Sequence, residues 1–310
     1  MVIEANNMRY TNKHNLSRIA VEWLLHDEYD YVKGVISATT LLKPIRSIIL
    51  GERHHKDMIM DVSGLIASRY GTAIHSSFEQ VPYGEHIKQE ERLFAPFGDV
   101  KVSGKYDMIE MLDSDFRLID LKSTSVWKYL MDDLEEFRKQ LSIYRYLLDK
   151  HGCPVRDIAR IIMVFTDWSK KRAMQGGDYP PIRMAEKDME LMPLDETEEF
   201  IQQRLDAVAD AKKLDDDDLP FCTDDELWKD VDKFAHMRTG RASAVKLYDT
   251  EEDAVVAVEN DPKGFLEVRK GVVKRCPTYC TCHPFCNQFK QMLEDGLVEE
   301  PEEVDERDII

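Results

Sequence analysis

The segment at residues 116–124, FRLIDLKST, places an acid and an amine inside a run of apolar residues. Leu-Ile-Asp-Leu-Lys is typical of a strand, and residues two apart in a strand point to the same face. Asp120 and Lys122 are therefore expected to lie side by side, flanked by residues that belong in a core. A structural salt bridge would explain this pair when the fragment is considered alone.

A second carboxylate precedes this pair, in the stretch Gly104-Lys105-Tyr106-Asp107. Residues 100–124 form two apolar-rich runs joined by Asp-Ser-Asp, a pattern that predicts a hairpin. Asp107 can then lie beside Asp120 on the neighbouring strand. Two adjacent carboxylates raise each other's pKa unless a cation lies between them, and such oxygen ligands suit Mg²⁺ or Mn²⁺. Lys122 could hold a water molecule or a scissile phosphate beside that metal.

The order Asp107, then Asp120-x-Lys122, resembles the signature of the PD-(D/E)XK nucleases, with Asp120 in the (D/E) position. An acid followed by x-Lys is common in any charged protein, so this pattern alone is weak. The strand VSGKYDMIE adds a second match, because it resembles the G-x-x-D strand of the same family.

Two further matches point to the RecB-like branch of that superfamily. His75 lies in GTAIHSSFE, before the hairpin, where this branch places a metal-binding His. Gln140 and Tyr144 in QLSIYRYLL have the Q-x-x-x-Y spacing that the branch carries on the next helix, and residues four apart share one helical face. His75 alone would more often be a core histidine, and Gln140 with Tyr144 an ordinary amphipathic pair. Four elements in this order are much harder to obtain by chance.

The resemblance implies an α/β fold with a PD-(D/E)XK restriction-endonuclease-like core, in which helices flank a mixed central sheet. A helical N-terminal region and a small C-terminal cysteine-rich metal module would complete it. It also implies that Lys122 positions the attacking water, while Gln140 and Tyr144 orient the DNA backbone or brace the site. The ligands of one or two Mg²⁺ or Mn²⁺ ions would be His75, Asp107, Asp120 and the Leu121 carbonyl.

A second constellation consists of cysteines. RCPTYCTCHPFC contains four of the six cysteines of the chain, and another stands earlier in PFCTDDELW. Such crowding in a reduced compartment indicates a metal site, and thiolate sets bind either Zn²⁺ or an iron–sulfur cluster. The five residues are Cys222, Cys276, Cys280, Cys282 and Cys286.

Several RecB-like nucleases, among them CRISPR-associated enzymes, close the nuclease domain with a [4Fe–4S] cluster held by one upstream and three clustered cysteines. Cys222, Cys276, Cys280 and Cys286 resemble this layout, with Cys282 as a substitute. The order differs from the family, because Cys222 follows the nuclease motifs and the closing spacing is not C-x₂-C. A Zn²⁺ site built from the four local cysteines, or including His283, therefore stays open. Cys153 is interpreted as structural.

Composition sets limits on the partners of the chain. Its 310 residues are 43% hydrophobic and 33% charged, which describes a globular protein. No apolar run is long enough to span a bilayer, and the first residues do not resemble a signal peptide, so we expect a cytoplasmic protein with no membrane partner. The net charge of −18 is concentrated in LDDDDL at 214–219 and in residues 294–310. The remainder is mildly acidic, so DNA could still meet a local basic groove.

Apolar spacing and turn residues predict the elements that position these motifs. We expect helices at 15–27, 36–55 (broken or started at Pro44), 56–80, 131–152 and 196–214, and a buried strand at 158–168. Beyond these, a short hairpin at 235–249, a helix at 250–261 and a strand at 264–276 are predicted. The domain prediction is a nuclease domain with a helical cap at 1–215, a cysteine module at 216–290 and an acidic disordered tail at 291–310.

The resemblance implies phosphodiester hydrolysis in DNA by a metal-dependent exonuclease of the bacteriophage type, acting in recombination or end processing in the host cytoplasm. The partners would be DNA and a recombination or replication protein. The alternative is a catalytically silent nuclease fold that serves as a DNA-binding or assembly subunit with a structural metal site. Both metal carboxylates and the Lys are present, which favours the enzyme.

Overall fold

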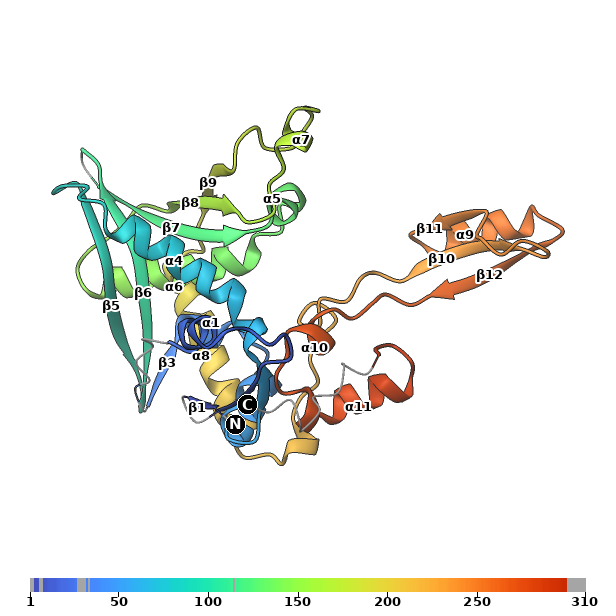
Figure 1. Ribbon diagram of the computed structural model, residues 1–310, viewed down its shortest axis with the longest axis horizontal. Helices are drawn as coiled ribbons and strands as arrows, with labels where there is room; N and C mark the ends of the chain where they lie inside the picture. The colour runs from blue at the N-terminus through green and yellow to red at the C-terminus, as the bar shows by residue number, and fades with distance from the viewer. Residues whose placement is uncertain (1–2, 6–7, 27–31, 33, 114, 300–310) are drawn as a thin grey trace. The chain divides into compact units, whose positions relative to one another are not determined.

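The computed structural model describes residues 3–5, 8–26, 32, 34–113 and 115–299 (Figure 1). The chain divides into two compact units. One, the sheet unit, consists of Asn12–Lys43 and Asp61–Ala209. The other, the cysteine unit, consists of Met1–Thr11, Pro44–Met60 and Asp210–Ile310. The domain boundaries after residues 215 and 290 stay predictions, because compactness alone does not define parts that fold independently.

A mixed sheet forms the centre of the sheet unit, as predicted, with the order β3-β6-β7-β8-β9 and with β5 paired to β6. The β3–β6 and β7–β8 pairs are parallel, and the others are antiparallel. The strands are β3 (Val35–Ser37), β5 (Ile87–Phe97), β6 (Val100–Met111), β7 (Phe116–Thr124), β8 (Ile158–Phe165) and β9 (Met184–Glu190).

The predicted hairpin is confirmed as β6 and β7, which pair from Met111↔Phe116 to Met108↔Ile119. One edge of β6 pairs with β5 along most of its length. Two strands share the other edge of β6. β7 pairs with its C-terminal end from Met108 onward, and β3 pairs with residues 101–103. Within the described ladder, the stretch of β6 between these two partners has no strand on that edge, and Asp107 lies in this gap.

Helices cover the sheet and connect its strands. The parallel β7–β8 pair requires a crossover, which α5 (Val126–Met131) and α6 (Glu135–Lys150) provide. In α6 eight consecutive residues from Leu141 to Leu148 are buried, and acidic residues in its first turn and Lys150 in its last match the helix dipole. The other helical elements are α1 (Arg18–Leu25), α2 (Ala38–Leu41), η1 (Val62–Leu65), α4 (Ile66–Glu79), α7 (Lys170–Ala173) and α8 (Leu194–Ala211).

The predicted helices lie at the expected positions in the chain, but the first and last residues of some of them differ from the prediction. Those at 15–27 and 196–214 correspond to α1 and α8, and the break at Pro44 is confirmed because α3 (Ile45–His54) begins after it. The helix predicted at 36–55 is wrong at its start, where β3 pairs with β6. The one at 56–80 is wrong before η1, because β4 (Ile59–Asp61) is a strand. Both strands are triplets with two apolar residues and one polar residue, for which sheet pairing outweighs helical spacing.

Two further departures concern the middle of the sheet unit. The helix predicted at 131–152 is α6, but it begins four residues later, after Asp132 adopts a left-handed φ of 55° and ends α5. The strand at 158–168 is confirmed as β8, whereas β5 and β9 were not predicted. Both carry many charges, and their strand conformation depends on pairing with β6 and β8.

The cysteine unit contains α3 and a small antiparallel sheet with the order β11-β10-β12. The predicted hairpin is confirmed as β10 (Lys233–Arg238) and β11 (Lys246–Tyr248), and the predicted helix as α9 (Glu251–Glu259). The predicted last strand is shorter, because β12 ends at Arg269. The remaining elements are β1 (Ile3–Ala5), β2 (Met8–Thr11), η2 (Asp216–Asp218), β12 (Gly264–Arg269), α10 (Arg275–Thr278), η3 (His283–Phe285) and α11 (Asn287–Glu294).

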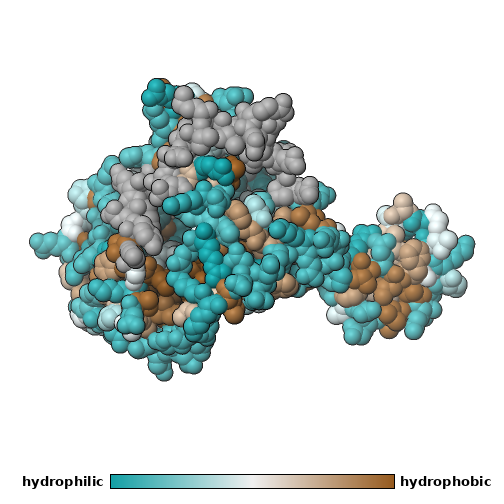
Figure 2. Space-filling model, turned by 90° about the horizontal axis from the view of Figure 1, so that it is seen from below, coloured by the Kyte–Doolittle hydropathy of each residue, from teal (hydrophilic) through white to brown (hydrophobic). Residues whose placement is uncertain are grey.

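Two further features are the C-terminal segment and an exposed apolar surface. Helix α11 extends into the first residues of the segment predicted as an acidic tail, and residues 300–310 of that segment lie outside the described residues. The lobe formed by β10–β12 and α9 exposes apolar side chains, which Figure 2 shows as brown patches at its right. They include Leu247, Val256, Phe265 and Val268. None of the described helices is long and apolar enough to cross a membrane.

Candidate active site and metal centres

Asp107 connects the two strands that carry the predicted acids. The β6–β7 ladder ends at Met108↔Ile119, and the Leu121 amide beyond it donates a hydrogen bond of 2.7 Å to Asp107 Oδ2. A side-chain oxygen thus replaces the next backbone partner of Leu121. This bond brings the Asp107 carboxylate next to the strand that carries Asp120, as the hairpin predicted.

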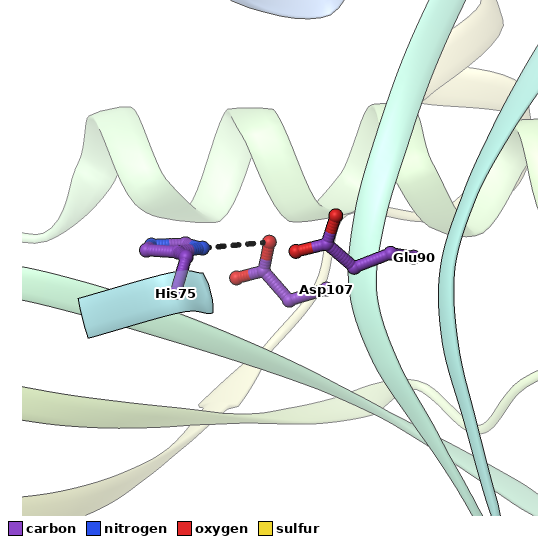
Figure 3. A group of neighbouring side chains, drawn as sticks. All are labelled: His75, Glu90 and Asp107. Atoms are coloured by element: carbon purple, nitrogen blue, oxygen red, sulfur yellow. Dashed lines mark ion pairs between the residues drawn. The ribbon is translucent and has the colours of Figure 1, made fainter. Parts of the chain in front are cut away.

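His75 and Glu90 converge on Asp107 from a helix and a strand (Figure 3). His75 Nδ1 on α4 lies 3.3 Å from Asp107 Oδ1. One ligand atom from each of the three side chains lies within 4.8 Å of the others, close enough to share one cation. Glu90 has a positive φ of 39°, which is unusual for a residue with a side chain, and it is left out of the β5–β6 ladder between two paired neighbours.

Asp120 is the most deeply buried acid of this site, with 1% of its surface exposed. Its Oδ2 forms an ion pair of 2.7 Å with Lys122 Nζ, and no hydrogen bond of regular geometry reaches this buried oxygen. Burial raises the pKa of Asp120, repulsion from Asp107 raises it further, and Lys122 opposes both. A buried carboxylate left in this state is stabilised by an additional cation.

Lys122 remains a cation although it is enclosed. Burial acts to lower its pKa, but attraction by the carboxylates of Asp120 and Asp107 outweighs burial, and the pKa is raised. Its amine also lies 5.3 Å from the centre of the Phe137 ring on α6, a cation–π contact. The result is a protonated donor held next to the buried carboxylate.

Two further contacts adjust the charge around Asp107. The hydrogen bond with Asp107 raises the pKa of His75, although burial opposes it. A histidine that binds a metal must be neutral at the ligating nitrogen, so metal binding here would compete with a proton. Glu90 Oε2 forms an ion pair with Lys105, which offsets part of the negative charge of the group.

Gln140 and Tyr144 share one face of α6, as their spacing predicted, and a hydrogen bond joins them. Gln140 Nε2 donates to Tyr144 Oη at 2.7 Å, and burial raises the pKa of Tyr144 to about 12, so its hydroxyl stays protonated. Gly104 on β6 allows this packing, because a Cβ there would lie 2.7 Å from the Tyr144 ring and 2.8 Å from Leu147. The glycine of the G-x-x-D strand is thus explained by the close approach of α6.

The structure brings most of the predicted residues together. The compact group of potential ligands lacks Asp120, which was predicted, and contains Glu90, which was not. His75 and Asp107 lie in the compact group of potential ligands, while Asp120 lies outside it and contacts Lys122. Leu121 lines the same pocket as His75 and Asp107. Glu90 belongs to the group but was missed, because β5 was not recognised as a strand. An acid on the strand that pairs with β6 opposite Asp107 would have been the signal.

These side chains fit a divalent cation. They supply an imidazole nitrogen and two carboxylates within 4.8 Å, next to a buried carboxylate oxygen without a hydrogen bond. Mg²⁺ and Mn²⁺ bind through one or more carboxylates together with water and substrate phosphate, and imidazole is an accepted ligand for transition metals. The arrangement therefore suits a hydrolytic metal centre that leaves positions free for substrate.

All five clustered cysteines line one pocket in the cysteine unit. Cys222 reaches it through Gln288 on α11, which donates to the Cys222 carbonyl at 2.9 Å and accepts from the Cys222 amide at 2.8 Å. Cys282 lies against α3, where its thiol donates to the Ser47 carbonyl at 3.5 Å. Cys153 lies in the sheet unit, packed against the hydrophobic core, in agreement with its interpretation as structural.

Arg46 on α3 is the second residue that the sequence did not reveal. Its side chain is 2% exposed and reaches the cysteine pocket, where Nη1 lies 3.8 Å from Cys286 Sγ and 2.6 Å from Asn287 Oδ1. The rest of the guanidinium donates to the carbonyls of Leu219 and Pro220. Arg46 therefore places one buried positive charge next to the thiols of the pocket.

The thiols differ in how easily they lose a proton. Burial raises the pKa of Cys222 and of Cys276 to about 12. A hydrogen bond with Cys282 lowers the pKa of Cys280 to about 6 and raises that of Cys282. His283 Nδ1 lies 2.7 Å from the Cys280 carbonyl, so this nitrogen carries the proton and Nε2 is the one left to act as a ligand.

The family model of the PD-(D/E)XK nuclease superfamily matches residues 50–287, and the chain belongs to this superfamily. Membership identifies the class as metal-dependent nucleases. No curated protein has a sequence that matches this chain significantly. Among solved structures, the crystal structure of SSO0001 is similar with a TM-score of 0.42 and 17% identity, over 61% of this chain and 82% of that one.

Proposed function

We propose that the chain is a metal-dependent deoxyribonuclease that hydrolyses phosphodiester bonds at the site around Asp107 and Asp120. The observation that carries this proposal is the buried Asp120 oxygen, which has no hydrogen-bond partner and lies 2.7 Å from the Lys122 amine. A purely structural acid at this depth would be expected to have its hydrogen bonds satisfied. Beyond its ion pair with Lys122, the acid keeps a buried oxygen that a metal ion could bind.

His75, Glu90, Asp107 and Asp120 are proposed to hold the Mg²⁺ or Mn²⁺ ions, with the Leu121 carbonyl as a further ligand. A bound ion would polarise the scissile phosphate and lower the pKa of the attacking water. Lys122 is a protonated donor beside that position, and it would orient the water or stabilise charge that develops on the phosphate. Gln140 and Tyr144 would hold the DNA backbone or brace Lys122.

The finer function we propose is an exonuclease that processes DNA ends in recombination or repair. The His75, Gln140 and Tyr144 motifs of the RecB-like branch support it, together with the hydrogen bond that joins Gln140 to Tyr144. Bacteriophage origin, cytoplasmic location and a recombination or replication partner stay predictions from the same resemblance.

For the cysteine pocket we propose a [4Fe–4S] cluster bound by Cys222, Cys276, Cys280 and Cys286. Four thiolates around one Zn²⁺ at about 2.3 Å lie within about 4.6 Å of one another. The thiols of the described chain form no group of three that is this compact, which supports a wider cofactor. The Cys282 thiol already donates to the Ser47 carbonyl, which supports its exclusion from the ligand set. Bound iron and sulfide would establish the cluster, whereas stoichiometric zinc would replace it by a Zn²⁺ site.

The test of the nuclease is cleavage of labelled linear and circular DNA, single- and double-stranded, with Mg²⁺ or Mn²⁺. Asp120→Asn preserves the shape of the side chain but removes its charge, and should lower the rate on the order of 10³-fold. Asp261→Asn is a matched control, because Asp261 is also buried but lies in the cysteine unit. Sparing of circular substrates would support the exonuclease. Equal cleavage by wild type and a folded Asp120→Asn variant would overturn the site, and DNA binding without cleavage would identify a silent subunit.

A further inference from the structure

Helix α5 begins directly after the strand that carries Asp120 and Lys122, and its surface is unusually apolar. Trp127 is 66% exposed, and Leu130 and Met131, three and four residues later, are 38% and 57% exposed. Residues at these spacings share one helical face. An indole exposed to this degree on a defined helix is available to contact a ligand.

The neighbouring loop between β8 and β9 supplies positive charge. Lys170, Lys171 and Arg172 are consecutive on α7 and exposed, and in the part of the chain that the structure describes none of them forms an ion pair. Arg172 lies 5.8 Å from the centre of the Tyr179 ring. Three unpaired cations in a chain with a net charge of −18 mark a local site for an anionic partner.

Hydrogen bonds hold the start of this loop beside the start of α5. Asp167 accepts from the Val126 amide at 2.7 Å, and the Thr166 amide donates to the Thr124 carbonyl at 2.9 Å. Within the loop, the Ser169 amide donates to Tyr179 Oη at 2.8 Å. The cations and the indole therefore emerge from the same end of the β7–β8 pair, as the ribbon shows for α5 and α7 (Figure 1). We call Trp127, Leu130, Met131, Lys170, Lys171 and Arg172 the α5–α7 surface.

Phe137 on α6 connects helix α5 with the candidate active site. Lys122 Nζ lies 5.3 Å from the centre of this ring, and Lys128 Nζ on α5 lies 5.5 Å from it. A single aromatic side chain thus separates the amine beside Asp120 from the helix that carries Trp127. A strand of DNA whose phosphate reaches Lys122 would have its adjoining nucleotides next to α5.

We propose that the α5–α7 surface binds the single-stranded end of a DNA substrate, with a base stacked on Trp127 and phosphates on Lys170, Lys171 and Arg172. The inference rests on the proposed nuclease function and names its substrate class. Exposed aromatic side chains interleaved with cations are the combination that binds unpaired strands, because only an unpaired base offers its face. Bases in a duplex are stacked on one another, so duplex DNA would use the cations but not the indole.

The test measures binding without cleavage, using the full chain, EDTA, and fluorescently labelled oligothymidylate or a blunt DNA hairpin closed by a linker without bases. Trp127→Ala should weaken oligothymidylate binding about 5- to 150-fold and leave hairpin binding unchanged. Trp127→Phe, which keeps a ring, should restore most of the affinity. Trp23→Ala is the matched control, because Trp23 is 48% exposed on α1, and it should have no effect.

The cations are tested by replacing Lys170, Lys171 and Arg172 together with Ala. This variant should bind both DNAs more weakly, and the slope of log K against log salt for the single strand should fall by about 2. Replacing three exposed lysines of the cysteine unit gives the same change in net charge and should not alter the slope. These lysines are Lys246, Lys263 and Lys270.

The outcomes separate this proposal from the nuclease itself. Loss of oligothymidylate binding by Trp127→Ala supports the α5–α7 surface even if the wild type cleaves no DNA, in which case only the proposed function fails. Cleavage by the wild type together with unchanged binding by Trp127→Ala overturns the α5–α7 surface and assigns its apolar residues to a protein contact. Equal losses on oligothymidylate and hairpin also overturn it, because stacking on an unpaired base would then play no part.

Discussion

Two buried acids in this chain are surrounded in opposite ways. Asp120 in the sheet unit is 1% exposed and Asp261 in the cysteine unit is 8% exposed. Asp261 accepts two hydrogen bonds from Arg238, at 2.8 and 2.9 Å, one from the Lys263 amide and a contact from His236. The buried Asp120 oxygen has a nearby amine but no hydrogen bond.

The pKa values of these acids move in opposite directions for this reason. Hydrogen bonds from Arg238 lower the pKa of Asp261 to about 2, whereas burial raises that of Asp120. Asp261 therefore stabilises the module of β10–β12 and α9, whereas Lys122 offsets the burial of Asp120 only in part. This contrast supports a structural role for Asp261 and a functional role for Asp120.

The cysteine pocket extends this contrast, because burial also raises the pKa of two of its thiols, Cys222 and Cys276. If they bind a metal cofactor, its loss should remove a connection between Cys222, α10 and α11. We expect Cys276→Ser to release bound iron or zinc and to lower the Tm by about 5 °C or more. Metal analysis and thermal unfolding of the same samples check this.

Cys153→Ser is the control for the cysteine prediction, because Cys153 lies outside the pocket, and it should change neither metal content nor Tm. Cys282→Ser separates the ligand sets. Full metal content in that variant would support the set that excludes Cys282, and loss of metal would require a set that includes it. A wild-type protein with no bound metal would contradict both.

Glu90 allows the role of the acids in the sheet unit to be tested further. It is the acid of the site that the structure revealed and the sequence did not. Glu90→Gln keeps the size of the side chain but removes one charge from the group with His75 and Asp107. We expect the Mg²⁺ or Mn²⁺ concentration for half-maximal cleavage to rise about 10- to 100-fold, because a potential ligand is lost. Titration of cleavage with each metal measures it.

The neighbour of Glu90 supplies the matched control. Glu91 accepts a hydrogen bond from Tyr106 at 3.2 Å and lies outside the potential ligand group. Glu91→Gln should therefore leave the metal requirement near that of the wild type. Equal shifts in the two variants would mean that general negative charge, rather than ligation by Glu90, sets the affinity.

Gly104 tests whether close packing behind Asp107 matters for the site. A Cβ at this position would lie 2.7–2.8 Å from the Tyr144 ring and Leu147, so Gly104→Ala must displace α6 or β6. Overpacking of this kind costs about 1–3 kcal/mol, which thermal unfolding would detect. Cleavage should fall as well, since Tyr144 and Asp107 would move.

Gly71 on α4 is a milder case against which Gly104 can be judged. Its nearest neighbour would be Ser123 Oγ at 3.2 Å, which a small rotation relieves. Alanine in the middle of a helix is also favoured over glycine by about 0.5–1 kcal/mol. Gly71→Ala should therefore leave the Tm unchanged or raise it. A loss in this variant as large as that of Gly104→Ala would contradict the packing argument.

The sequence predicted the parts of the site that depend on local patterns. Asp107, Asp120 and Lys122 could be placed because alternation and a short turn define a hairpin within one stretch of chain. Gln140 and Tyr144 could be paired because a helix fixes the distance between residues four apart. These inferences needed no knowledge of distant contacts.

Glu90 and Arg46 could not be predicted in the same way. The strand that carries Glu90 has no clear alternation, and it is a strand because it pairs with β6 over most of its length. Arg46 is an ordinary cation of a helix until the distant carbonyls of Leu219 and Pro220 enclose it. Their roles come from partners far away in the chain, which spacing along the sequence does not reveal.

The smallest effect on stability is expected for Asp261, whose hydrogen bonds are already formed, and this effect should depend on pH. The pKa of Asp261 is about 2 when folded, against 3.8 without its partners, so the ionised form favours the folded state. Its stabilisation is therefore complete above about pH 4 and is lost as the pH falls toward 2. At about pH 6 the Asp261→Asn variant should have a lower Tm than the wild type. The difference in Tm between the two proteins should become smaller as the pH is lowered. The exposed Asp249, which pairs with Lys233, is the control, and Asp249→Asn should change the Tm little at any pH. A difference for Asp261→Asn that persists unchanged to pH 2 would show that the shape of the side chain, and not its charge, holds α9 to the sheet.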